Sequence, residues 1–322
     1  MSMSIILPPI ITFIVGYMLI KYPISISVPT DRGMHKSNIA SSGGIAILAG
    51  IIISLFIANV PWPGFSGVVA LMIITITIIG YIDDKKSLKK LFRFVSQILI
   101  SIVIVSEAKT YYYTELDTAL AIFSTILIIY TINIYNFMDG IDQLAISQAI
   151  FFTISSAILF YHSTAGLALI FISFYLLNYK NTKIFLGNSG SYLLGLYIAG
   201  QMILMPQVVI DNVFIAMFIL MTTFYVDATY TLMNRFFTKF STDATIIESI
   251  EHITQAHRLH AYQKLAIKYG SHSKVVFLMM LYNYIWCLPL AYIASTYDYF
   301  LIPILLSYLP YIYFCYKNEA GS

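Results

Sequence analysis

The chain has 322 residues, of which 59% are hydrophobic and only 10% are charged, and its mean hydropathy is +0.81. Soluble domains carry about 25% charged and about 45–50% apolar residues, so this composition excludes a soluble globule, a disordered chain and a disulfide scaffold. The apolar excess extends from Ser4 to Tyr316, which excludes a single membrane anchor, and a net charge of +3 is too small to indicate nucleic-acid binding. The composition therefore predicts a polytopic membrane protein.

The apolar segments predict helices. A helix needs about 20 mostly apolar residues to span a bilayer, and the segments lack the two-residue alternation of a membrane β-barrel. We therefore expect an all-α transmembrane bundle, in which the break at Pro61–Gly64 separates two spans. Eleven spans are predicted, near residues 3–21, 43–59, 67–82, 94–108, 118–137, 144–161, 164–179, 190–205, 212–233, 275–294 and 299–316.

The distribution of Lys and Arg predicts the orientation of these spans, because basic residues gather in cytoplasmic loops. With the N-terminus outside, 17 of the 18 basic residues fall in inner loops or the inner C-terminal tail, and only Lys109 lies outside. We expect a single domain over residues 1–322, a cytoplasmic C-terminus and one long cytoplasmic loop at 234–274.

Nearly every residue capable of chemistry follows the inner end of a predicted span. Asp227, within a span, lies eight residues before Arg235, about 12 Å along a helix, and so belongs to the inner third. A transporter is expected to place polar groups near the bilayer midplane. The one-sided distribution instead indicates chemistry between a water-soluble substrate and a lipid.

Two adjacent carboxylates, Asp83 and Asp84, end the third predicted span. Such neighbours repel each other unless a cation lies between them, and Mg²⁺ prefers carboxylate and phosphate oxygens. The pair predicts a metal and phosphate site. Ordinary loop charges beside Lys85 and Lys86 remain the alternative.

Four polar residues recur every three positions at the inner end of the fifth predicted span. Residues three apart lie near one another on a helix, and helix capping requires one Asn or Asp rather than four. The pattern therefore favours a functional site formed by Asn133, Asn136, Asp139 and Asp142.

Three further inner segments add binding groups. The glycine-rich turn Phe185–Ser191 leads into the eighth span and offers N–H groups to an anion. His257–Gln263 combines His and Arg, which suits a diphosphate or a sugar nucleotide and lacks zinc-ligand spacing. The first inner loop adds cations at Asp31–Lys36 and a flexible entry at Ser42–Gly44. Taken singly, the glycine turn is a weak signal, the histidine motif is better explained as a solvated loop, and the first inner loop can be explained by the excess of basic residues inside.

Taken in order, these five segments resemble the polyprenyl-phosphate N-acetylhexosamine-1-phosphate transferase family, of the glycosyltransferase 4 type. The His257–Gln263 pattern is more similar to the O-antigen-initiating branch than to the muramoyl-pentapeptide branch. The resemblance implies transfer of an N-acetylated amino-sugar 1-phosphate from a UDP-sugar to undecaprenyl phosphate, with Mg²⁺ and release of UMP. It also implies an active site on the cytoplasmic face of a bacterial inner membrane, in O-antigen or related surface polysaccharide synthesis. The identity of the sugar and a homodimer are left open.

The resemblance also assigns roles by motif. It implies catalytic roles for Asp83, Asp84, Asp139 and Asp142, and Mg²⁺ binding at Asp84, Asp139 and the position of Asn188. The residues expected to bind substrate are Arg32, His35, Lys36, Asn133, Asn136, Gly187, Ser191, His257, Arg258 and His260.

Asn188 departs from the family pattern. The family turn reads Gly-Asp-x-Gly-Ser, and its aspartate is a magnesium ligand, whereas an asparagine offers a carbonyl oxygen without charge. Three interpretations are open: an engineered inactivating substitution, a natural change that is offset elsewhere, and a protein that binds substrate without turnover. The alternative function is a transporter, or a non-catalytic binder, of a nucleotide sugar or polyprenyl-linked sugar.

Overall fold

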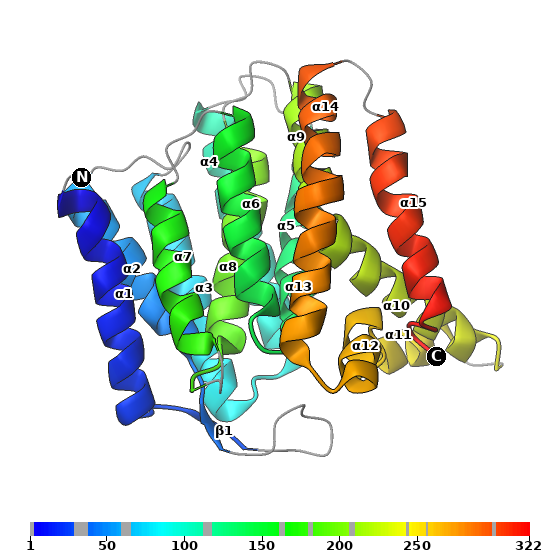
Figure 1. Ribbon diagram of the computed structural model, residues 1–322, viewed down its shortest axis with the longest axis horizontal. Helices are drawn as coiled ribbons and strands as arrows, with labels where there is room; N and C mark the ends of the chain where they lie inside the picture. The colour runs from blue at the N-terminus through cyan, green and yellow to red at the C-terminus, as the bar shows by residue number, and fades with distance from the viewer. Residues whose placement is uncertain are drawn as a thin grey trace. The chain divides into compact units, whose positions relative to one another are not determined.

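The chain forms helices, as the sequence predicts. In the computed structural model the described residues are 3–28, 38–58, 66–111, 118–160, 165–179, 183–205, 210–242, 245–255, 257–297 and 301–322. Apart from one two-stranded sheet, the regular structure of these residues is helical (Figure 1), which confirms the all-α prediction. They divide into two compact units, one comprising Met1–Val28 and Ser37–Ile210 and the other, among the described residues, Asp211–Ser322.

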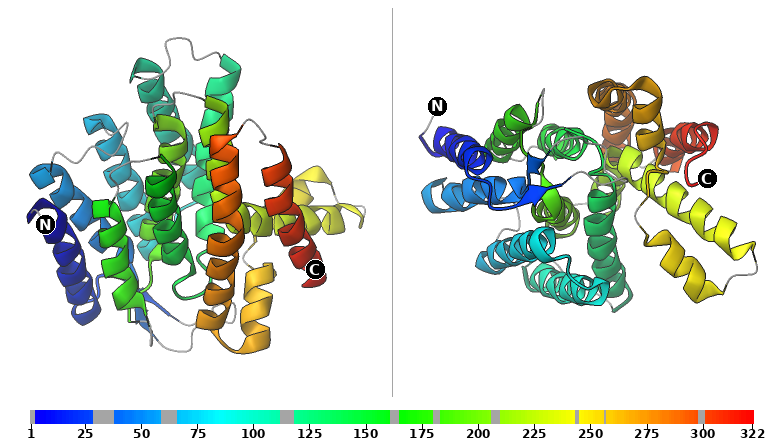
Figure 2. Two further views of the ribbon diagram at one scale, coloured as in Figure 1. Left: turned by 45° about the horizontal axis from the view of Figure 1, so that its top comes forward. Right: turned by 90° about the horizontal axis from the view of Figure 1, so that it is seen from below.

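The first unit is a bundle arranged around its last helix, α8 (Gly187–Leu204). This helix packs against α2, α3, α4, α5 and α6 (Figure 2, right), and every residue from Ser189 to Leu204 is buried. A helix that is apolar on all sides belongs in such a central position. The surrounding helices are α1 (Met3–Lys21), α2 (Gly43–Ala58), α3 (Gly67–Lys86), α4 (Lys90–Tyr111), α5 (Thr118–Phe137), α6 (Leu144–Phe160) and α7 (Ala165–Asn178).

A short two-stranded sheet holds the entry to α8. Strand β1 (Ile26–Ser27) pairs antiparallel with β2 (Ile39–Ala40), with Ile26 opposite Ala40. The Phe185 N–H donates to the Ala40 carbonyl at 2.8 Å, and the Gly43 N–H donates to the Phe185 carbonyl at 2.9 Å. The start of α2 is thereby fixed against the turn that precedes α8.

The second unit contains a bent helix pair and a long continuous helix. Helices α9 (Ile210–Leu220) and α10 (Thr222–Phe240) meet at about 70°. Helix α10 packs against α11 (Ile246–Ile253), α12 (Ala261–Tyr269) and α15 (Leu301–Lys317). The continuous helix is formed by α13 (His272–Tyr282), the π-helical turn η1 (Asn283–Cys287) and α14 (Leu288–Thr296).

The described residues of the eleven predicted spans fall mainly on helices, with 212–233 covering parts of both α9 and α10, but not every helix is long and apolar enough to cross a bilayer by itself. Among the described residues, five helices pass that test, and α9 with α10 makes a sixth if the bent pair is one span. The apolar helices α2, α6, α7 and α15 are shorter. The chain is a multi-pass helical bundle, and the number eleven stays a prediction.

Two predicted boundaries need correction. The span expected at 212–233 is not one continuous helix: it is bent at Met221, between α9 and α10. The predicted loop 234–274 is largely helical: α10 continues to Phe240, and α11 and α12 lie within the loop. A capping box between Thr245 and Glu248 starts α11.

Candidate functional site

Two helices approach closely in the first unit, and a glycine permits it. A Cβ added at Gly80 of α3 would lie 2.5 Å from the backbone carbonyl oxygen of Asn188, at the start of α8. A side chain at position 80 would therefore push the two backbones apart. This contact brings Asp83 and Asp84, one helical turn further along α3, against the first turn of α8.

Asp84 caps the N-terminus of α8. Its carboxylate accepts the backbone N–H of Asn188 at 2.8 Å and that of Ser189 at 3.3 Å. Gly187 has φ +71°, and a Cβ there would lie 2.6 Å from Asp84 Oδ2, so both backbone and space require glycine. Two of the N–H groups that the sequence predicted for an anion are therefore engaged by a carboxylate of the chain itself.

Asp83 has a different environment, although it precedes Asp84 directly. It is only 4% exposed. Its Oδ2 atom accepts from the Arg93 guanidinium, the Tyr192 hydroxyl and the Asn188 side-chain amide, each at 3.0 Å, and its Oδ1 accepts the Leu88 N–H at 2.8 Å. Asp83 is thus a neutralised and fully engaged carboxylate that ties α3 to α4 and α8.

The two asparagines of the predicted cluster point to different helices. Asn136 of α5 donates its amide to Asn188 Oδ1 at 2.7 Å and to Ser191 Oγ at 3.0 Å. Asn133, one turn earlier, donates instead to Gln97 Oε1 of α4 at 2.7 Å. The structure therefore joins Asn136, Asn188 and Ser191 to the α3–α8 contact and places the amide of Asn133 against α4.

The two aspartates of that cluster lie beyond the end of α5. Helix α5 ends at Phe137, so Asp139 and Asp142 lie in the turn before α6, and the expected helical register of four residues is wrong beyond Asn136. Burial raises the pKa of Asp139 well above its ordinary value, and the nearby carboxylates of Asp84 and Asp142 raise it further. A cation would relieve this concentration of negative charge.

The donor set around Asp139 suits Mg²⁺ in one particular way. Among the residues that the structure describes, no three His, Cys, Asp or Glu side chains gather as a complete metal cage. Mg²⁺ is often held by one or two carboxylates, with phosphates and water as its other ligands, and Asp84 and Asp139 match that description. Asn188 fits less well, because its amide already bonds to Asp83 and Asn136.

The motif His257–Gln263 belongs to the second unit. The His257 Nδ1 accepts the Leu259 N–H at 3.3 Å, which places the proton of the neutral ring on Nε2. Burial lowers the pKa of His257 to about 3, and the nearby His260 and Arg235 act in the same direction. His260 is 2% exposed, and its Nδ1 lies 3.2 Å from Asp227 Oδ1, whereas Arg258 is half-buried.

Some predicted residues are not placed, and some important residues were not predicted. Arg32, His35 and Lys36 lie outside the described residues. Arg93 and Asp227 were not predicted to belong to a site, although a charged residue within an apolar span requires a buried partner. Tyr192 carried no comparable signal, because tyrosine is common throughout this chain.

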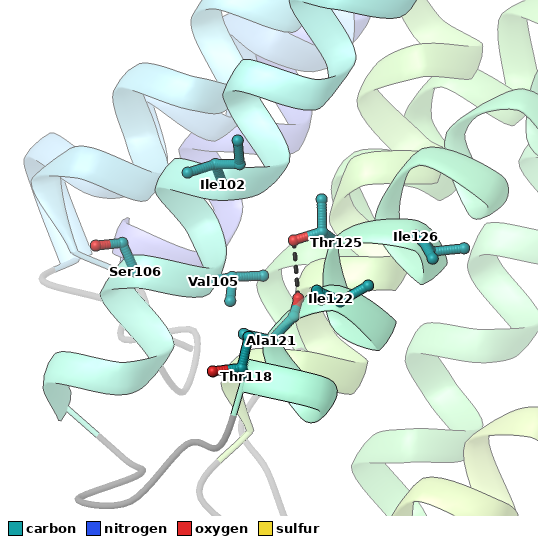
Figure 3. A pocket seen from close by; sticks show the side chains of 8 residues that line it. All are labelled: Ile102, Val105, Ser106, Thr118, Ala121, Ile122, Thr125 and Ile126. Atoms are coloured by element: carbon teal, nitrogen blue, oxygen red, sulfur yellow. Dashed lines mark hydrogen bonds between the residues drawn. The ribbon is translucent and has the colours of Figure 1, made fainter.

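A separate groove of about 490 Å³ lies between α4 and α5 (Figure 3). Its lining comes from the second half of α4 and the first half of α5, and the hydroxyl of Thr125 donates to the Ala121 carbonyl beside it. No predicted site residue lines it. The residues that do are Ile102, Val105, Ser106, Thr118, Ala121, Ile122, Thr125 and Ile126.

Part of the chain is similar to a known family. Residues 66–206 match the family model described as glycosyl transferase family 4. This range includes α3, α5 and α8, which carry the site of the first unit.

Curated relatives agree with that match. The decaprenyl-phosphate N-acetylglucosaminephosphotransferase of Mycobacterium leprae is 29% identical over 54% of this chain and 53% of its own length. The probable undecaprenyl-phosphate N-acetylglucosaminyl 1-phosphate transferase of Bacillus subtilis is 24% identical over 81% of the chain and 77% of its own length. The phospho-N-acetylmuramoyl-pentapeptide-transferase of Staphylococcus saprophyticus is 27% identical over 54% and 64%. The match to the mycobacterial relatives thus spans about half of their length.

Proposed function

We propose that the chain, whose residues 66–206 match the glycosyl transferase family 4 model, transfers an N-acetylated amino-sugar 1-phosphate from a UDP-sugar to undecaprenyl phosphate and releases UMP. The reaction takes place on the cytoplasmic face of a bacterial inner membrane and starts O-antigen or a related surface polysaccharide. The chain acts as a monomer or a homodimer.

The observation that carries the proposal is the acidic centre where α3 meets α8. Asp84 is fixed by two backbone N–H groups, and its charge acts on Asp139 in the turn after α5. Mg²⁺ held by Asp84 and Asp139 would supply charge neutralisation to the diphosphate and to the UMP leaving group. Phosphoryl transfer depends mainly on such positioning and charge neutralisation.

The chain needs no strong base for this reaction. An oxygen of the lipid phosphate attacks the phosphorus that carries the sugar, and the bond from that phosphorus to UMP breaks. A phosphate monoester has a second pKa of about 6, so the attacking oxygen is already largely ionised at neutral pH. Asp83, which is paired with Arg93, positions the α3–α8 contact, and Asp142 adds negative charge beside Asp139.

The remaining polar residues orient the substrates. Asn136 and Ser191 present amide and hydroxyl groups beside the acidic centre, where they orient the nucleotide. The neutral His257, with its proton on Nε2, and the cationic Arg258 donate to phosphate oxygens. Arg32, His35 and Lys36 add positive charge for the same anions, as the sequence predicts.

The test is a transfer assay with purified protein, undecaprenyl phosphate and a panel of radiolabelled UDP-sugars. Product is resolved by thin-layer chromatography, and UMP is measured in parallel, with Mg²⁺ or with EDTA. We expect lipid-linked sugar and UMP in equal amounts from one sugar class, at least 100-fold less with EDTA, and a comparable loss in Asp84→Asn. Flux of sugar across sealed vesicles without UMP release would identify a transporter instead, and binding without either would identify a non-catalytic binder.

A further inference from the structure

Asp227 is a buried carboxylate that the proposed reaction does not use. It lies in α10, is fully buried, and accepts the backbone N–H of Ala261 at 3.1 Å and of Tyr262 at 3.0 Å. The His260 Nδ1 lies 3.2 Å from the same carboxylate. A carboxylate is stabilised at a helix N-terminus by the free N–H groups and the helix dipole, so Asp227 holds the start of α12 and orients the ring of His260.

Arg235 makes the complementary contact at the other end of the same stretch of chain. Arg235 is buried, with only 3% of its surface exposed. Its guanidinium donates to the carbonyl of His252 at 2.6 Å, of Ile253 at 2.9 Å and of Gln255 at 3.3 Å. These carbonyls end α11, where a cation is favoured by the helix dipole, so Arg235 holds the end of α11.

The residues between these two contacts form a segment, Thr254–His260, which we name the histidine segment; it contains His257 and Arg258. Asp227 and Arg235 are eight residues apart on one helix, which is about 12 Å at 1.5 Å per residue. Both ends of the segment are therefore fixed to the same rigid helix. Its middle is held as well, because the N–H of Gly321 donates to the Leu259 carbonyl at 2.8 Å.

We propose that Asp227 and Arg235 are a pair of positioning residues, through which α10 fixes both ends of the histidine segment and so sets where His257 and Arg258 meet the sugar nucleotide. The activity readout of this proposal rests on the proposed function, and the structural readout does not. Neither residue touches substrate in this assignment, since the Asp227 carboxylate is fully buried and Arg235 is engaged by backbone carbonyls.

The structural test is hydrogen exchange measured by mass spectrometry on the full chain in detergent. In Asp227→Asn the carboxamide can accept only one of the two N–H groups, so we expect peptides covering 257–263 to exchange at least tenfold faster than in the wild type. Arg235→Lys keeps the charge but loses the forked donor, and we expect faster exchange of 252–260. Peptides from α13 and α14 should be unchanged in both variants, which shows that the fold is intact.

Two controls separate positioning from general loosening. Lys239→Gln removes a positive charge one turn beyond Arg235, and Thr231→Val removes a hydroxyl 3.4 Å from Asp227 Oδ1; both should exchange like the wild type. In the transfer assay, we expect kcat to fall at least tenfold and KM for the UDP-sugar to rise in Asp227→Asn and Arg235→Lys. If exchange of 252–263 is unchanged in these two variants, or increases equally in the controls, the proposal is overturned. A wild type without transfer activity would refute the proposed function alone, because the exchange result does not depend on catalysis.

Discussion

Replacement of Asn188 by aspartate should make the stability of the protein depend on a divalent cation. In the structure the Asn188 amide donates to Asp83 Oδ2 at 3.0 Å, and its carbonyl oxygen accepts from Asn136 at 2.7 Å. In Asn188→Asp the donor becomes a carboxylate oxygen that faces Asp83. Two unit charges 3 Å apart repel by about 5–6 kcal/mol at an effective dielectric near 20, and a charge-assisted hydrogen bond worth about 1.5–3 kcal/mol is lost.

Part of that repulsion will be relieved, because Arg93 also faces Asp83 and the new side chain can rotate or take up a proton. A net loss of about 3 kcal/mol in EDTA is a reasonable expectation, which lowers Tm by roughly 6 °C for a chain of this size. A cation that binds between the carboxylates restores about 2.7 kcal/mol at 100 times its dissociation constant. We therefore expect Tm of Asn188→Asp, but not of the wild type, to rise by several degrees from EDTA to 10 mM Mg²⁺.

The assay is thermal unfolding in detergent, followed by tryptophan fluorescence, with transfer activity measured on the same samples. Asn133→Asp is the matched control: it makes the same chemical change on α5, one turn before Asn136, where the side-chain amide donates to the neutral Gln97 and to the Ile129 carbonyl. The amide of Gln97 can turn and donate to the new carboxylate, so no cation is required. The reasoning is refuted if Asn188→Asp is as stable as the wild type in EDTA, or if Asn133→Asp responds to Mg²⁺ to the same extent.

Three further outcomes are expected. Gly80→Ala should lower the free energy of unfolding by about 1–3 kcal/mol, as over-packing does, because the new methyl group would lie 2.5 Å from the backbone of α8. Gly67→Ala is the control: position 67 has open space around it, so Tm should be unchanged. Arg93→Gln should cost up to about 3 kcal/mol by leaving the buried charge of Asp83 without its cation, and Asp83→Asn in the same chain should recover most of that loss in Tm. The pKa of His257 is about 3 in the folded state, below the unfolded value of about 6.5. The unfolded state therefore binds more protons, and stability falls as pH is lowered from 7 to 5. His257→Gln should show a smaller fall in Tm over that range.

Hydropathy and spacing alone predict much of the fold because each apolar run must become a helix in lipid. The break between α9 and α10 escapes that reasoning. Mean hydropathy over 212–233 is high enough for one span, but Asp227 must find donors, and it finds them at the N-terminus of α12. The partner is more than thirty residues away along the chain, so no local pattern in the sequence reveals the bend.

The candidate site, like the fold, is predicted from the sequence only in part. The sequence identifies the acidic motifs and the glycine turn, since each is a local arrangement of chemically distinct residues. It cannot show that Asn133 turns to α4 while Asn136 turns to α8, because both occupy equivalent positions on one helix. Only the packing of α4 and α8 on either side of α5 separates them.

The same limit explains why two adjacent aspartates have different tasks. Successive residues on a helix point about 100° apart, so one carboxylate of the Asp83–Asp84 pair meets Arg93 of α4 while the other meets the first N–H groups of α8. The charge of Asp83 is neutralised by Arg93. The carboxylate of Asp84 accepts only hydrogen bonds, and its negative charge raises the pKa of Asp139. A cation is therefore attracted to the Asp84 side of the pair. Loss of the Asp83 carboxylate should weaken the packing of α3 against α4 and α8 and so lower Tm. Loss of the Asp84 carboxylate should instead reduce the dependence of transfer on Mg²⁺. Measuring Tm and the EDTA sensitivity of transfer for each variant distinguishes these two effects.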